Sequence, residues 1–241
     1  MILLAVLLGG AGVSVESELS RVLTVPLAEL VDRDVQVRID PVVDQWLLPR
    51  ADRRALLEWG LPQGLLVCAA PRLDALPTLV PNLAGELERS LISADQRLYL
   101  LGSYGDELVT PDGEDLTLWI GVVAGDGRVL GIRSRPVTTL DMHPQPREYY
   151  ADLYHPSVCP FSSSVAAFVE VAWRWQAASE VIYSQPEPPL SAGADAGWAH
   201  QVSQRRACEQ MLVSLAAFDP ALAVTDPRSL WVDEITPDRT C

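Results

Sequence analysis

One stretch, "CPFSSSVAAFVEVAWRW" (Cys159 to Trp175), brings several nucleophile-type side chains together. A cysteine, a proline and three serines stand there directly before an apolar run that contains two tryptophans. Cysteine and serine are side chains that attack carbonyl groups in covalent catalysis. The stretch therefore has two interpretations, an active-site loop or the start of a helix with an apolar face. The first predicts an enzyme and the second a binding protein.

A cysteine-dependent hydrolase would use Cys159 with His143, His155 or His200 as its base. A reactive thiolate needs a helix N-terminus or a cation nearby, and Cys159 lies only a few residues before a predicted helix. Pro160 intervenes, however, and the sequence has neither a glycine-rich oxyanion turn nor a GxSxG motif. A serine at a helix N-cap also has its oxygen occupied by backbone N–H groups. The hydrolase centred on Cys159 stays an alternative hypothesis.

Metal and nucleotide sites have less support. His143, His155 and Cys159 lie close together in the chain, but that segment has no second cysteine and no HExxH motif. All 18 basic residues are arginine, so a phosphate-binding loop of the GxxxxGK[ST] type is excluded. We therefore predict no metal and no cofactor.

The formal net charge of −14 limits the class of partner. Such a surface repels nucleic acid and anionic membranes, so we predict direct binding to neither. It attracts a basic partner, although ordinary acidic solubility would give the same composition. Six carboxylates stand in or beside predicted turns: Asp106, Glu107, Asp112, Glu114, Asp115 and Asp126. They form either a solvated rim of loops or a docking face for a cationic protein, where such charges chiefly raise the association rate.

Short β-rich runs occupy the middle of the chain. They are "RLYLLG", "DELVT", "LTLWIGVVA" and "RVLGIRS", with turn residues between them at 102–105, 111–113 and 125–127. The Gly-Asp-Gly of the last turn supplies the positive φ angles of a tight hairpin. These runs predict a meander of about four strands, mostly antiparallel.

Two helices and one strand are predicted before this meander. The alternating "DVQVRID" (34–40) predicts a strand, and "ELERSL" (86–91) a brief helix or a turn. Asp52 is predicted to cap a helix that ends at Trp59, with Gly60 in the left-handed C′ position and Pro62 preventing continuation.

Helices follow the meander. An apolar face predicts a helix that begins at 162–164 and ends near Tyr183, and its members are Val165, Phe168, Val169, Ala172 and Trp173. The proline-rich 184–197 reads as a linker. The same spacing recurs at Cys208, Met211, Leu212 and Leu215, which predicts a second helix. A last short helix is expected with Asp226 as N-cap and Pro227 at its first position.

The order of elements predicts an α+β fold: one domain over residues 1–241, in which a central, mainly antiparallel β-meander packs against N- and C-terminal helices. The role of 1–45 is open, and Ile2 to Leu8 is expected to form a buried strand or helix rather than a secretory signal.

The four cysteines form no CxxC pair, which favours free thiols in a reducing cytoplasm. Cys68 and Cys208 are expected in the core, and Trp119, Trp173 and Trp175 between sheet and helix.

Four motifs together resemble the SUKH superfamily of immunity proteins, and most of all its fourth subgroup, found in bacteria that carry polymorphic toxins. They are the helix followed by "GLP" (56–62), the runs "YLLGSYGDEL" and "VVAGDGRVLGI", and "SSSVAAFVEVAWRW". Ser162 to Ser164 and Phe168 stand where the family has an asparagine/serine motif and an apolar-Phe pattern, although Phe161 or Ser162 replaces the frequent asparagine. "LWVDEI" resembles the family's closing helix. The likeness covers residues 50–180.

The resemblance implies a non-enzymatic cytoplasmic protein that binds and neutralises a cognate toxin. Such toxins are frequently basic nucleases or deaminases, which fits the independent observation of a −14 charge. A regulatory or scaffold protein of the same fold is the alternative, and the order of neighbouring genes would distinguish the two. The oligomeric state is open.

Overall fold

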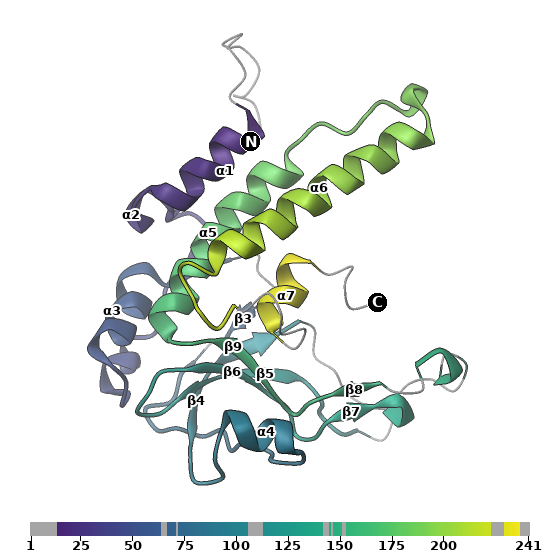
Figure 1. Ribbon diagram of the computed structural model, residues 1–241. Coiled ribbons are helices and arrows are strands. Elements are labelled where there is room, and N and C mark those ends of the chain that lie inside the picture. The colour runs from purple at the N-terminus through teal and green to yellow at the C-terminus, as the bar shows by residue number, and fades with distance from the viewer. Residues whose placement is uncertain are drawn as a thin grey trace.

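The computed structural model describes residues 14–63, 67–70, 72–105, 113–141, 145, 147–150, 153–222 and 229–236 (Figure 1). The helices are α1 (Val15–Thr24), α2 (Leu27–Leu30), α3 (Arg50–Trp59), α4 (Glu86–Leu91), α5 (Val165–Tyr183), α6 (Ala194–Leu215) and α7 (Leu230–Ile235), with short 3₁₀ turns η1 (Pro41–Gln45), η2 (Thr139–Asp141), η3 (Arg147–Tyr150) and η4 (Leu190–Ala192). The predictions for 2–8, for "DELVT" (106–110), and for Asp226 and Pro227 lie outside these residues.

The centre of the fold is a five-stranded antiparallel sheet with the order β3-β4-β5-β6-β9. Its strands are β3 (Val67–Ala69), β4 (Leu98–Tyr104), β5 (Leu118–Val123), β6 (Val129–Ile132) and β9 (Val158–Ser162). Two small antiparallel pairs stand beside it, β1 (Gln36–Val37) with β2 (Leu61–Pro62), and β7 (Val137–Thr138) with β8 (Tyr154–His155). The expected α+β class with a central antiparallel sheet is confirmed.

The hairpin between β5 and β6 forms where the glycines predict it. Gly125 and Gly127 have φ angles of 97° and 79°, a region that only glycine occupies without strain. Gly127 is required for a second reason, because a Cβ atom there would lie 2.1 Å from Oδ2 of Asp52. This turn therefore touches α3 directly.

Strand β9 was not predicted, since "SVCP" reads as the end of a proline-broken loop. It lies at the edge of the sheet, next to β6. Proline cannot donate to a β-ladder and is tolerated in edge strands and at bulges. Pro160 meets both conditions, because the β6–β9 register shifts between Val129 and Leu130, the residue opposite Pro160.

Both faces of the sheet are covered. Tyr99, Leu101, Ile120 and Phe161 belong to the large core that includes α5, α6 and α7. Alternate residues of the same strands, among them Leu98 and Val123, join a smaller cluster with Ile92 and Leu91 under α4. Figure 1 shows α4 on the opposite side of the sheet from α5 and α7. The strands read as near-continuous apolar runs for this reason.

Helix α5 lies at the centre of the helical layer and contacts α1, α2, α3 and α6. The predicted apolar face is confirmed, since all five of its members are buried. Val171 and Trp175 on other faces are buried too, because α5 has neighbours on every side. Trp173 and Trp175 therefore lie in the core as expected, whereas Trp119 is only half-buried.

Arg174 is a buried charged residue on α5, and it binds the backbone at the end of α1. Its guanidinium donates to the carbonyl oxygens of Val22 and Val25 at the end of α1 and pairs with Glu170. It also lies 4.1 Å from the ring centre of Phe218. The described part of the segment of uncertain role, residues 14–45, therefore packs against α5.

Several helix ends differ from the predictions. The prediction of Asp52 as the N-cap of α3 is wrong: the helix begins at Arg50, after Pro49. Gly60 does end it, with φ 56°. Helix α6 begins at Ala194, inside the predicted linker, and Ser229 stands at the N-cap of α7. These ends depend on packing as well as on local side-chain preference.

The N-terminus of α5 explains what Asp52 does. Its Oδ1 accepts the backbone N–H of Ala166 at 2.8 Å, so it caps α5 rather than its own helix. Ser164 is the local cap and accepts from Ala167 at 3.1 Å. Asp219, also buried, accepts from the N–H of Ser163 at 3.2 Å.

Ser162, the first serine of the motif, contacts the last helix. The hydroxyl oxygen of Ser162 accepts the indole N–H of Trp231 on α7 at 3.0 Å. The hydroxyl of Ser162 thus connects α7 to the start of α5, and the backbone of Ser163 connects Asp219 to it, whereas Ser164 caps its own helix. The interpretation of the serines as a helix start is confirmed for Ser164, the N-cap.

Replacing Asp52 tests the tertiary cap. We expect Asp52→Ala to lower the free energy of unfolding by about 1–2 kcal/mol, because it leaves the N–H of the half-buried Ala166 without its acceptor. Asp52→Asn keeps an acceptor oxygen and is expected to cost clearly less. Chemical denaturation of both variants at neutral pH measures the difference, and equal losses would contradict the cap.

The contribution of the Asp52 carboxyl to stability depends on pH. Burial raises the pKa of Asp52 above its ordinary 3.8, against the lowering effect of the Ala166 hydrogen bond. The folded chain then holds this proton more readily than the unfolded chain, so its contribution to stability grows as the pH falls through the raised pKa. The wild type should gain stability relative to Asp52→Asn between neutral pH and pH 4.

Candidate functional site

Cys159 lies inside the fold. It belongs to β9, opposite Gly131, and its side chain is 5% exposed among the apolar residues of the large core. Its Sγ lies 3.6 Å from the carbonyl oxygen of Pro156. A substrate carbonyl cannot reach a thiol in this position without opening the sheet edge.

The expected base is also poorly placed. His155 lies on β8, a strand whose side chains are exposed, and His200 lies on α6. His143 lies outside the described residues. One cation does approach the thiol: burial lowers the pKa of Arg133, while the nearby Cys159 and Asp233 act in the opposite direction.

The predicted acidic face is divided by the structure. Asp106, Glu107 and Asp112 lie outside the described residues. Glu114 and Asp115 precede β5, whereas Asp126 follows it in the hairpin. The six residues of β5 separate the two groups by about 20 Å, so the structure does not bring Asp126 together with the other two.

The three described carboxylates each have a partner in the chain. Asp126 pairs with Arg128 at 2.9 Å. Oδ1 of Asp115 accepts the N–H of Thr117 at 2.8 Å. Glu114 pairs with Arg135 at 2.8 Å. Asp115 and Asp126 remain exposed to solvent, so they can still attract a cation.

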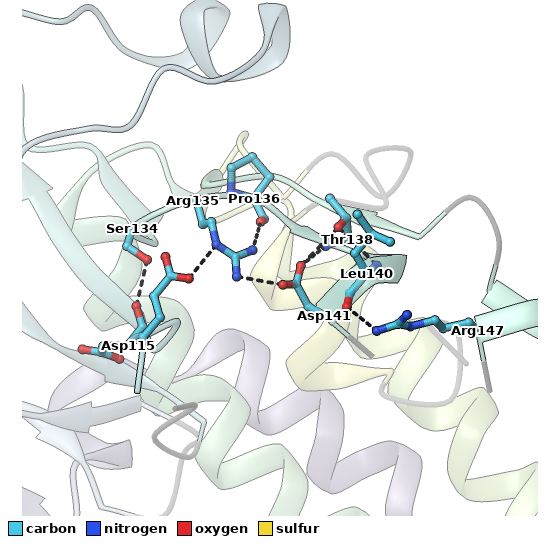
Figure 2. Close-up of polar contacts among 9 residues, drawn as sticks. Asp115, Ser134, Arg135, Pro136, Thr138, Leu140, Asp141 and Arg147 are labelled. Carbon is cyan, nitrogen blue, oxygen red and sulfur yellow. Dashed lines mark hydrogen bonds and ion pairs between the residues drawn. The ribbon is translucent and has the colours of Figure 1, made fainter. Parts of the chain in front are cut away.

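Arg135 is the centre of a polar cluster that the sequence did not reveal (Figure 2). Its guanidinium lies between two carboxylates, with Nε 2.8 Å from Glu114 and a terminal nitrogen 2.7 Å from Oδ1 of Asp141. It also donates to the carbonyl of Pro136. The other oxygen of Asp141 accepts from the N–H of Thr138 at 2.7 Å. We call these residues the Arg135 clamp.

The Arg135 clamp shifts the titration of its members. Its hydrogen bond to Asp141 and that to Glu114 raise the pKa of Arg135. The same guanidinium, helped by the N–H of Thr138, lowers the pKa of Asp141 to about 2. The ion pair therefore persists throughout the physiological range of pH.

The clamp holds the base of a projecting segment within residues 133–157, of which the structure describes 133–141, 145, 147–150 and 153–157; we call these described residues the arm. The arm connects the neighbouring strands β6 and β9 and contains β7, η2, η3 and β8. Figure 1 shows the β7–β8 pair extending beyond the central sheet, away from α5 and α6. The hydroxyl of Ser134 donates to the carbonyl of Asp115, and that of Tyr154 to Glu88 on α4.

The arm carries exposed apolar side chains. Leu140 is 76% exposed and Tyr149 is 78% exposed. Arg147 donates to the carbonyl oxygen of Leu140 at 2.7 Å, which ties η3 to η2 (Figure 2). A short run of prolines and aromatics was the only sequence signal of this segment.

Two surface hollows of about 440 Å³ lie along α3, and both are lined by Arg50, Arg54 and Glu58. In the part of the chain that the structure describes, no three His, Cys, Asp or Glu side chains are placed to hold a metal ion. Nor does any described helix have the length and apolar character needed to cross a membrane. The arm is the surface element on which the two most exposed large apolar side chains of the described residues lie.

The fold is of the α+β class, with a central antiparallel sheet. A model of the SUKH-4 immunity protein family matches residues 23–236, and the chain belongs to that family. The match extends the resemblance seen in the sequence to α2 and to the closing α7. No curated protein and no solved structure matches the chain significantly.

The titration of Asp141 tests the Arg135 clamp. We expect a carboxyl pKa of about 2 in the wild type and a return toward 3.8 in Arg135→Met, since the guanidinium lowers it. A depressed pKa stabilises the folded state above pH 3.8, and this stabilisation is lost as the pH falls toward 2. Carbon-detected NMR of the carboxyl groups measures both values. Arg128→Met, at the other end of the sheet, should leave Asp141 unchanged.

The reactivity of Cys159 tests the hydrolase alternative. A thiol that is 5% exposed in a strand should react with iodoacetamide at least about 100-fold more slowly in the native protein than in denaturant. Mass spectrometry of digested peptides assigns the modified cysteine. Rapid native alkylation of Cys159 near neutral pH would contradict its place in the core.

Proposed function

We propose that this chain is an immunity protein that binds a cognate toxin and neutralises it by stoichiometric inhibition. The observation that carries the proposal is its membership of the SUKH-4 immunity protein family across residues 23–236. Binding, and not turnover, is the activity that the buried Cys159 and the exposed arm support. The site of action proposed is the cytoplasm of the bacterium that makes the toxin.

The proposed toxin is basic, a nuclease or a deaminase. A surface of net charge −14 is attracted to a cationic protein over a long range, and this raises the association rate. A toxin that handles nucleic acid presents a positively charged groove, which an acidic inhibitor can occupy. The same charge opposes direct binding of the chain itself to nucleic acid or to an anionic membrane.

A regulatory or scaffold protein of the same fold is the second candidate. It has the same family membership and the same charge, so the genetic neighbourhood separates it from the first. A neighbouring gene for a large secreted protein with a variable C-terminal toxin domain favours immunity. The cysteine-dependent hydrolase is the least supported, because its nucleophile is buried.

Neutralisation at equal concentrations is the decisive test. The product of the adjacent toxin gene, co-expressed with this chain, should co-purify with it, and its activity should fall to background at a 1:1 ratio. Raising the salt from 50 to 500 mM should slow association by about tenfold or more, because exposed charges are screened. A toxin that stays active at a 1:1 ratio would contradict immunity, whereas binding without salt dependence would contradict only the electrostatic part.

The exposed acids can be tested one at a time in the same assay. We expect Asp115→Asn to lower the association rate about twofold and to leave the dissociation rate nearly unchanged. The matched control is Glu16→Gln, which removes an exposed carboxylate on α1, far along the chain from the clamp. Asp126→Asn reports separately on the other end of β5.

A further inference from the structure

Leu140 and Tyr149 form the most exposed apolar pair on any projecting element that the structure describes. They are 76% and 78% exposed, and they come from η2 and η3, which the Arg147–Leu140 hydrogen bond joins. Other exposed apolar residues lie on separate elements: Leu76 precedes α4, and Trp198 lies on α6. Large apolar side chains grouped on a projection are typical of contact surfaces.

The arm is held in one conformation at its base. Arg135 is fixed by Glu114 and Asp141, and Tyr154 is bound to Glu88. The backbone pairs Val137 with His155 and Thr138 with Tyr154. A base that is fixed before binding reduces the conformational entropy lost on association, so apolar contacts of the arm contribute more fully to affinity.

The charges beside these side chains select the partner. Among the described residues of this surface, the exposed charged side chains of Asp115 and Glu148 are both acidic. The three arginines of the arm are half-buried: Arg135 is held between carboxylates, Arg147 donates to a carbonyl, and Arg133 is the third. The face that solvent meets is therefore apolar at the tip and negative at the side.

We propose that the arm is the docking surface for a basic protein, with Leu140 and Tyr149 entering an apolar depression on the partner while Asp115 and Glu148 face its cations. This inference rests on the proposed function, since the partner is then the cognate toxin. The Arg135 clamp is a positioning device, because it holds the two anchors without touching the partner. Anchors of this kind carry most of the binding energy of an interface.

The double variant Leu140→Ser/Tyr149→Ser of the full chain tests the anchors. We expect its affinity for the toxin to fall at least about 30-fold, mainly through faster dissociation. Both side chains are exposed, so the thermal unfolding midpoint should stay within about 2 °C of the wild type. Surface plasmon resonance with immobilised, catalytically inactive toxin measures both rates.

The matched control is Leu76→Ser/Trp198→Ser, which removes one aliphatic and one aromatic side chain of comparable exposure elsewhere. It should change the affinity less than about threefold. If the wild type inhibits the toxin and the arm variant binds as tightly as the control, the docking inference is overturned while the proposed function stands. If the wild type itself does not inhibit the toxin, the proposed function is contradicted, and the docking inference that rests on it is contradicted as well.

If the arm binds something other than the toxin, the same variants give distinct results. A wild type that self-associates in sedimentation, together with an arm variant that does not and yet still inhibits, would assign the arm to a second copy of this chain. Wild-type binding to anionic vesicles that the arm variant loses, again with inhibition intact, would assign it to a membrane. Either result overturns docking of the toxin on the arm.

A double-mutant cycle tests the clamp. Arg135→Gln should weaken toxin binding in the wild type about fivefold, but should have little further effect in the Leu140→Ser/Tyr149→Ser background. A merely structural role would lower the affinity equally in both. Equal losses would therefore overturn the assignment of Arg135 as a positioning residue.

Discussion

The N-terminus of α5 is the point on which the rest of this structure depends. A helix begins with backbone N–H groups that have no partner in the helix, and burial makes each of them costly. Here Ser164 satisfies one locally, while Asp52 from α3 satisfies another. Asp219, which follows α6, binds the backbone just before the helix. Helix α3 and the segment after α6 thereby meet at one end of α5, which has more buried residues than any other described helix.

This arrangement leaves little free surface for function in the centre of the molecule. The sheet is covered by helices on one face and by α4 on the other, and α5 is enclosed by its neighbours. The described surface includes the outer sides of the helices, with the two hollows along α3, and the segment that leaves the sheet between β6 and β9. The long β6–β9 connection, where a tight turn would have sufficed for neighbouring antiparallel strands, is consistent with a role in contact.

Charge and apolar surface serve different steps of the proposed recognition. The net charge of −14 acts at a distance and affects how often a basic partner arrives. Leu140 and Tyr149 act only at contact and affect how long it stays. The clamp around Arg135 uses carboxylates for a third purpose, since Glu114 and Asp141 orient the arm. Acidic residues near one another in a chain can thus differ in what they do.

The sequence by itself determined the fold class, the hairpin at Gly125 to Gly127, the apolar face of α5 and its Ser164 cap, because these depend on residues a few positions apart. Only the tertiary structure decided that Asp52 caps α5, a contact across 114 positions, and that Pro160 lies in an edge strand. It also divided the predicted acidic face, because β5 separates Asp126 from Glu114. Local patterns report backbone preference, whereas these contacts depend on which surfaces the chain brings together on folding.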